Sequence, residues 1–143
     1  MTNGKVQPRS GFTLIELLVA MTILAVLMGI SLVSYQGAKK SARDGKRKAD
    51  LEQIRSALEI YRTDCKTYPT SLTFGNPLTG TGTSCSGNTY MAVIPVDPGS
   101  CSYYYSGSAN SYTLCASLET GGTSVTGCGS CGSCTCNYKV TNP

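Results

Sequence analysis

The sequence of 143 residues contains no histidine and no tryptophan, and it carries little charge beyond Lys66. The charged side chains after that position are Asp97, Glu119 and Lys139. Because histidine is the most frequent general base and metal ligand, its absence excludes a Ser–His or Cys–His catalytic pair. Two isolated carboxylates do not make a convincing acid–base pair either. The sequence therefore argues against an enzyme, and it implies no cofactor.

Cysteine is absent from the first 64 residues, and eight cysteines follow. An even number of cysteines in a small, loop-rich segment is typical of disulfides formed in an oxidising compartment. The C-x-x-C-x-x-C spacing near the end would also suit zinc or an iron–sulfur centre, but a secreted chain would have to acquire the metal outside the cytoplasm. We therefore expect disulfides and no metal. The candidates are Cys65, Cys85, Cys101, Cys115, Cys128, Cys131, Cys134 and Cys136.

The disulfide pairing does not follow from the sequence, because eight cysteines allow roughly a hundred arrangements. Our provisional pairs are Cys65 with Cys85, which would tie the loop after the long helix back to that helix, and Cys101 with Cys115, which would brace a hairpin. The second pair requires an irregular hairpin loop, because a symmetric four-residue loop places those two residues on opposite faces of the sheet.

An apolar run from Phe12 to Tyr35 is interrupted by one carboxylate, Glu16. About 20 apolar residues suffice to cross a membrane as a helix. A cleaved signal peptide and a plain membrane anchor are the simplest interpretations. No small-residue cleavage site follows the run, which passes directly into a charged helical pattern. Neither interpretation explains Glu16, because a charge within a membrane segment is expensive and usually functional.

The stretch GFTLIELLVAMTIL, at residues 11–24, resembles the N-terminal motif of type IV prepilins and of the related pseudopilins of type II secretion systems. The resemblance implies that residues 1–11 are a leader, that a prepilin peptidase cuts after Gly11, and that the same enzyme methylates Phe12. Glu16 is then the fifth residue of the mature chain. An inner-membrane assembly platform is a further implied partner.

Glu16 has a physical role in such a chain. A helix rises 1.5 Å per residue, so Glu16 lies only about 6 Å along the axis from the new amino terminus at Phe12. When apolar helices pack side by side, this carboxylate can pair with the Phe12 amine of an adjacent subunit, and a buried charge is tolerable only when it is paired. We therefore expect Glu16 and Phe12 to be assembly residues of a homo-oligomeric filament.

The segment after the apolar run is amphipathic. Leu51, Ile54, Leu58 and Tyr61 are spaced three or four residues apart on one helical face. Pro69 prevents continuation, so one helix is predicted from Phe12 to about Thr63. It combines a transmembrane or filament-core part at 12–35 with a stalk at 36–63.

Residues 64–143 are predicted to form a small cysteine-rich head. Strands are predicted at 90–94, 102–106 and 111–118, with a hairpin loop at 107–110. The fold class is therefore α+β, with a long N-terminal helix, a small antiparallel sheet packed on its amphipathic half and a disulfide-rich C-terminal region.

The stalk and head also resemble the major pseudopilin of type II secretion, through KRKADL, IRSALEIYRTD and YMAVIPVDPGS. That pseudopilin has an acidic C-terminal loop that binds calcium. Residues 121–143 contain no Asp or Glu, so we expect no calcium dependence.

The placement of basic residues conflicts with this topology. The stretch from Lys39 to Lys48 holds more basic residues than Lys5 and Arg9 ahead of the apolar run, which by the positive-inside rule would keep the C-terminal side in the cytoplasm. The cysteines and the processing motif favour the opposite orientation. We expect a single-pass protein in cytoplasmic-membrane lipid, with its head outside, that later joins an extracellular or periplasmic filament.

Two alternatives to a pilus-like filament subunit stay open at this point. The N-terminus does not separate a type IV pilus subunit from a type II secretion pseudopilin. A DNA-binding subunit of an uptake filament is less favoured, and it would use nucleic acid contacts from the basic stalk or from a stacking platform made of the tyrosines at 103–105.

Overall fold

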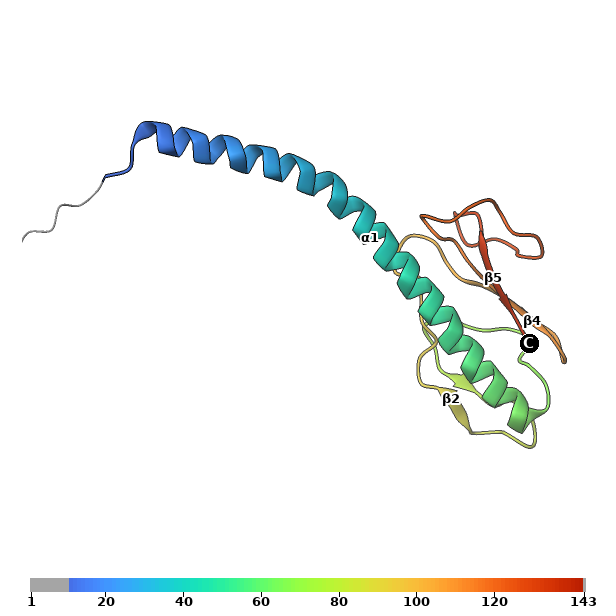
Figure 1. The fold of residues 1–143 in the computed structure, drawn as a ribbon. Coiled ribbons are helices and arrows are strands. Elements are labelled where there is room, and N and C mark those ends of the chain that lie inside the picture. Colours follow the sequence, from blue (N-terminus) through green and yellow to red (C-terminus); the bar gives the residue numbers. More distant parts are fainter. Residues whose placement is uncertain (1–10, 143) are drawn as a thin grey trace, which may run out of the picture. The chain divides into compact units, whose positions relative to one another are not determined.

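The fold is described from a computed structural model, which describes residues 11–142. A single α-helix, α1 (Leu14–Cys65), precedes five short strands (Figure 1). The chain divides into two compact units, of which the first ends at Ala38 and the second begins at Lys39. The predicted leader, residues 1–11, lies outside the described residues except for Gly11.

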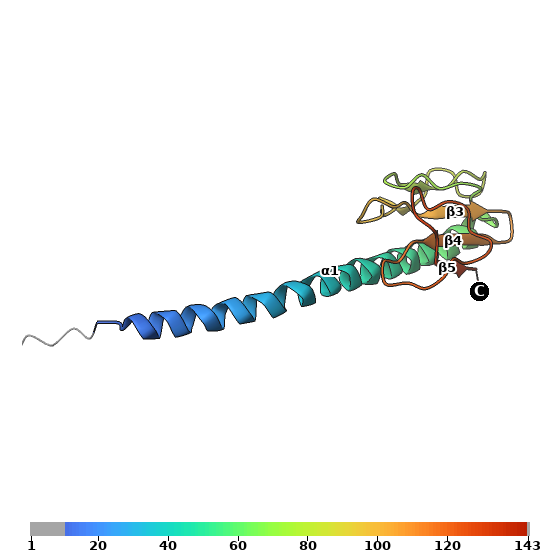
Figure 2. The same cartoon turned by 90° about the horizontal axis from the view of Figure 1, so that it is seen from above.

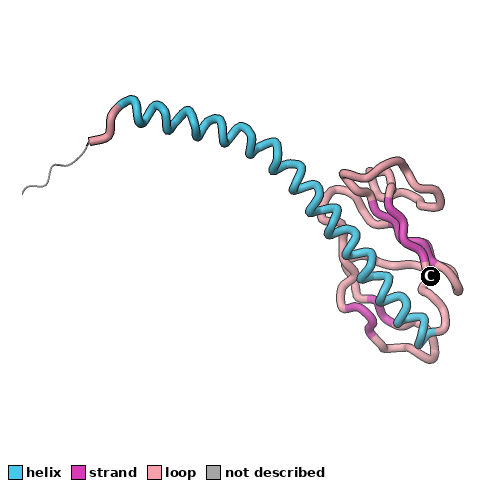
Figure 3. Tube along the Cα trace, viewed as in Figure 1, coloured by secondary structure: helices cyan, strands magenta, loops and turns pink. Residues whose placement is uncertain are grey.

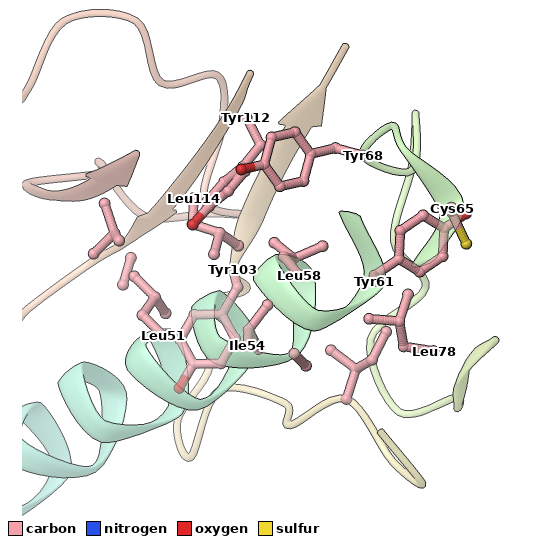
Figure 4. Close-up of a cluster of buried hydrophobic side chains, with 14 of the residues drawn as sticks. Leu51, Ile54, Leu58, Tyr61, Cys65, Tyr68, Leu78, Tyr103, Tyr112 and Leu114 are labelled. Carbon is pink, nitrogen blue, oxygen red and sulfur yellow. The ribbon is translucent and has the colours of Figure 1, made fainter. Parts of the chain in front are cut away.

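The second unit has a hydrophobic core built on one face of α1. The fully buried side chains Leu51, Ile54 and Leu58 face Tyr103 and Leu114 of the head (Figure 4). Because these helical positions are spaced by three and four residues, they form one stripe that the rest of the head covers. The predicted amphipathic half of the helix and its packing on the cysteine-rich region are confirmed.

Helix α1 ends two residues later than predicted, at Cys65. Lys66 adopts a positive φ of 65°, and its N–H donates to the Arg62 carbonyl at 2.9 Å. A left-handed residue directly after the last helical turn is the usual way in which a helix ends. The helix has therefore already stopped when the chain reaches Pro69.

The strands form two antiparallel sheets. The smaller sheet pairs β1 (Leu78–Thr79) with β2 (Thr89–Met91), and the larger has the order β3 (Tyr104–Gly107), β4 (Tyr112–Ala116), β5 (Tyr138–Thr141) (Figure 2). Tyr104 pairs with Cys115, and Leu114 pairs with Val140. The rest of the head is loop (Figure 3).

The three predicted strands exist, with shorter bounds, and the hairpin loop is 108–111 instead of 107–110. The sequence analysis missed β1 and β5. β1 has two residues, which is too short for an alternating pattern to be visible. β5 lies after the long cysteine-rich loop, where its pairing with β4 is a long-range contact.

Candidate functional site

The first described residues leave the predicted cleavage bond accessible. Gly11, Phe12 and Thr13 precede the helix, and the Phe12 side chain is 83% exposed. A Cβ added to Gly11 would meet nothing within 4 Å. Nothing in the described part of the chain therefore shields the bond between Gly11 and Phe12.

Glu16 lies in the first turn of α1, three residues after Thr13. The Thr13 hydroxyl accepts a hydrogen bond from the Glu16 N–H at 3.3 Å, so Thr13 caps the helix. A Thr followed by Glu three residues later is the spacing of a capping box, which the sequence analysis did not consider for Glu16. The backbone of Glu16 therefore serves the cap, and its exposed carboxylate stays available for another partner.

The first unit presents apolar side chains on all sides of the helix. Among its described residues none is buried, and the large apolar side chains are 47–84% exposed. By length and composition α1 contains one segment apolar enough to cross a membrane. Since a helix that is apolar all round needs an apolar environment, this surface must be covered by lipid or by other protein.

A buried ion cluster joins the stalk part of α1 to two loops of the head. The Arg47 side chain is 1% exposed and donates to both carboxylate oxygens of Asp97, at 2.7 and 3.0 Å. It also donates to Asp44 at 2.8 Å and to Glu119 at 3.1 Å. Arg43 pairs with Glu119 from the outside. One guanidinium thus connects three segments that are far apart in the sequence.

Asp44 completes this cluster as a cap for the loop after β4. Its carboxylate accepts hydrogen bonds from the backbone N–H groups of Glu119 at 2.8 Å and Thr120 at 2.7 Å, and from the Thr120 hydroxyl at 2.6 Å. Burial alone would raise the pKa of Asp44, but these hydrogen bonds and Arg47 outweigh it and lower the pKa to about 2. The same carboxylate therefore stays ionised in a position that is only 4% exposed.

The pKa values of Glu119 and Arg47 shift in the directions that keep both side chains charged. Hydrogen bonding from Arg43, and then from Arg47, lowers the pKa of Glu119 to about 2. The hydrogen bonds to Asp97 raise the pKa of Arg47 above its ordinary value. The cluster is thus a fixed set of charges, which fits a structural joint better than proton transfer.

The sequence analysis missed the buried members of this cluster. Asp44 and Arg47 continue the stripe of Leu51, Ile54 and Leu58 towards the N-terminus with the same spacing of three and four residues. That periodicity was the available pattern, and it was overlooked because a charged residue is rarely buried unless it is paired.

All eight cysteines form disulfides, and no cysteine is free. The pairs are Cys65–Cys85, Cys101–Cys134, Cys115–Cys128 and Cys131–Cys136. The first agrees with our provisional pairing. The predicted Cys101–Cys115 pair is wrong, because Cys115 pairs across the sheet with Lys139 and Tyr104 and its sulfur bonds to the loop beyond β4.

Three of these disulfides fix the acid-free C-terminal loop. Cys115, Cys131 and Cys136 are buried together and pack on Tyr104. At Gly129 an added Cβ would lie 2.3 Å from the Tyr104 ring, so the loop can lie on that ring only as glycine. The sulfurs of the C-x-x-C-x-x-C stretch are therefore occupied by disulfides instead of being thiolates for a metal.

The donors in the head do not fit the calcium ion that the family resemblance suggests. Calcium requires six to eight oxygen ligands, carboxylates among them. The carboxylates of Asp97 and Glu119 are bound to guanidinium groups. The described residues contain no group of three potential ligands placed to hold a metal.

The three consecutive tyrosines do not form a stacking platform. Tyr103 is buried and donates to Asp50 at 2.7 Å, and burial together with this bond raises its pKa. Tyr105 donates to the Pro69 carbonyl at 2.7 Å. Tyr104 lies on the disulfide cluster. These rings are therefore engaged in the head itself, which removes the tyrosine argument for nucleic acid binding.

Comparison with known proteins identifies two families along the sequence. The "Prokaryotic N-terminal methylation motif" matches residues 7–32, and "Type II secretion system (T2SS), protein G" matches residues 34–127. No solved structure matches.

Several relatives carry the name type II secretion system core protein G, which is not the name of an enzyme. The one from Vibrio cholerae is 27% identical over 128 residues, with 82% of this chain and 88% of the relative covered. The one from Pseudomonas aeruginosa is 30% identical over 128 residues, with 80% and 88% covered. The match to Aeromonas hydrophila is 35% identical over 63 residues and spans 44% of either chain.

Proposed function

This chain belongs to the type II secretion system protein G family, and we propose that it is a pseudopilin that polymerises into a pilus-like filament. Prepilin peptidase cuts it after Gly11 and methylates Phe12. The processed chain spans the inner membrane once, with its head in the periplasm. The assembly platform then moves it from membrane lipid into a filament of identical subunits and other pseudopilins.

The observation that carries this proposal is the apolar helical surface, which no other described part of the chain covers. The side chains of Leu14 and Ile15, for example, are 84% and 71% exposed, because no other described part of the molecule covers them. Burying one such side chain contributes about 1.5–3 kcal/mol. In the membrane, lipid covers this surface, and in the filament the equivalent helices of neighbouring subunits cover it.

Glu16 sets the axial register of that packing. The amine of processed Phe12 is cationic, and in the filament core it needs an anionic partner. Glu16 is an acidic side chain of the same apolar segment, in the first turn of α1 and four residues after Phe12. A neighbouring subunit that slides until its Phe12 amine meets Glu16 is fixed at one axial position.

A secretion pseudopilin is preferred to a type IV pilus subunit, because the protein G family description covers residues 34–127. The cysteine-rich tail had favoured a pilin exposed outside the cell. Disulfides also form in the periplasm, so the tail is compatible with either location.

The experiment compares filament assembly by the wild-type chain with three variants, Glu16→Ala, Glu16→Gln and Glu16→Asp. The cap survives in all three, because it uses only the Glu16 N–H. Loss of a buried charge partner is worth about 3–5 kcal/mol at each contact. We expect Ala and Gln variants to accumulate as processed monomer in the membrane, and the Asp variant to retain some filaments.

Filament yield and membrane content are measured by immunoblotting of the filament and membrane fractions from the same cells. Filaments from Glu16→Gln at the wild-type level would contradict the pairing with Phe12. Wild-type protein that is not associated with the membrane before assembly would contradict the proposed membrane anchor.

A further inference from the structure

The basic cluster at the start of the second unit contains two kinds of cation. Arg43 and Arg47 are paired with carboxylates of the head. Lys39, Lys40 and Lys46 are exposed, as is Lys48. In the described part of the chain none of these four lysines takes part in a salt bridge. The Lys48 ammonium lies over the Tyr138 ring of the head, 5.7 Å from the ring centroid. The sequence shows six similar charges, whereas the structure engages three of them, Arg43, Arg47 and Lys48, with the head.

We propose that the two lysines nearest the apolar run, Lys39 and Lys40, bind anionic phospholipid headgroups on the outer surface of the membrane that holds the subunit. We call these two residues the lysine collar. The inference rests on the proposed function, because it requires the apolar part of α1 to lie in a bilayer. Its partner is a lipid with a net negative phosphate headgroup, such as phosphatidylglycerol.

The position of the collar in the sequence fits this partner. Lys39 follows Tyr35, the end of the apolar run, by four residues of the same helix. Headgroups extend roughly 5–7 Å beyond the hydrocarbon core on each side. The Cα–Cβ bonds of a helix tilt towards its N-terminus, which here is the membrane end, so the lysine side chains lean towards the lipid. Their long aliphatic stems allow the ammonium groups to reach the phosphates.

The arrangement of the collar around the helix also favours lipid over nucleic acid. With 3.6 residues per turn, positions 39 and 40 lie about 100° apart around the helix axis. A transmembrane helix is surrounded by headgroups on every side, whereas a nucleic acid duplex contacts one face. The bidentate arginines that typically read phosphates and bases are committed to the head.

This inference gives a role to basic residues on the outer side of the membrane, where the positive-inside rule does not expect them. Two of the six cations, Arg43 and Arg47, are paired with Glu119, Asp44 and Asp97. The four lysines still outnumber Lys5 and Arg9. Of these four, Lys39 and Lys40 hold the monomer at the surface until it is extracted into a filament.

The test places the full chain in phospholipid nanodiscs and measures the association of spin-labelled phosphatidylglycerol relative to spin-labelled phosphatidylcholine. The collar variant is Lys39→Gln/Lys40→Gln. Each lysine near a membrane surface raises the local association of an anionic lipid about fivefold, which corresponds to about 1 kcal/mol. Averaged over all lipid sites around the helix, we expect a preference of roughly twofold or more in the wild type. We expect the collar variant to lose most of it.

A matched pair of double variants separates position from net charge. The collar variant removes two cations next to the membrane, and Lys66→Gln/Lys139→Gln removes two cations elsewhere in the head. Lys5 and Arg9 are unchanged in all variants, so their contribution is a constant background. We expect the preference for phosphatidylglycerol to fall in the collar variant and not in Lys66→Gln/Lys139→Gln. In the wild type it should fall when 0.5 M salt is added.

Equal preference in the wild type and the collar variant would overturn the proposal, and so would equal losses in the two double variants. A lysine-dependent mobility shift with duplex DNA in neutral nanodiscs, without any phosphatidylglycerol preference, would assign the collar to nucleic acid instead. If the wild-type chain is washed from the bilayer by carbonate, the proposed membrane anchor fails. If it stays inserted without lipid preference, only the lysine collar fails.

Discussion

Replacing Arg47 by methionine is expected to destabilise the head more than any surface charge change. The substitution keeps most of the buried volume but removes the partner of Asp97, whose side chain is 1% exposed. Asp44 retains its hydrogen bonds from Glu119 and Thr120, and Glu119 retains Arg43. The main effect is therefore one carboxylate left buried without a cation, which is worth about 3–5 kcal/mol. Since a domain of this kind is stable by about 5–15 kcal/mol, the loss is a large fraction of its stability.

The assay is urea unfolding of the full chain in neutral detergent, followed by near-ultraviolet circular dichroism. The buried tyrosines Tyr61, Tyr103 and Tyr112 make this a measurement of the head and not of the apolar helix. The control is Arg55→Met, because Arg55 and Glu52 are exposed and 3.5 Å apart, a pair worth less than about 1 kcal/mol.

A second variant identifies the source of the loss. In Arg47→Met/Asp97→Asn the orphaned charge is gone, so part of the stability should return. Equal free energies of unfolding for Arg47→Met and Arg55→Met would refute the assignment of Arg47 as the joint between stalk and head.

Two further predictions concern acid and the disulfides. The pKa of Asp44 is lowered from 3.8 to about 2, so as the pH falls the unfolded chain binds a proton at Asp44 before the folded head does. Stability should therefore be constant above about pH 5 and should decrease by about 2 kcal/mol towards pH 2 because of this residue. If Asp44→Asn showed the same decrease, Asp44 would be excluded as the cause. Reduction should unfold the head, because each native disulfide of a small secreted domain contributes about 2–5 kcal/mol. A calcium chelator should leave the melting temperature of the head unchanged. Unfolding by the chelator and not by the reductant would show that a metal holds the C-terminal loop.

The sequence was sufficient for the long helix and for its apolar and amphipathic halves, because these rest on local periodicity and composition. Leu51, Ile54 and Leu58 are buried as their spacing predicts. The motif around Gly11 and Glu16 was recognisable for the same reason, since it is contiguous.

What the sequence could not supply depends on contacts between distant segments. Arg47 continues the apolar stripe of α1, but its burial requires Asp97 and Glu119 to arrive from two loops, and the sequence does not show which carboxylates will pair with it. The Cys101–Cys134 bond likewise joins residues 33 positions apart, with β3 and β4 between them.

The most direct test of the account is the intact mass of the native protein purified from membranes and filaments. The account predicts a chain that begins at Phe12, heavier than that sequence by CH2 because a methyl group replaces one hydrogen, and eight hydrogens lighter because of four disulfides. A chain that begins at Met1, or one cut on the C-terminal side of the apolar run, would contradict it.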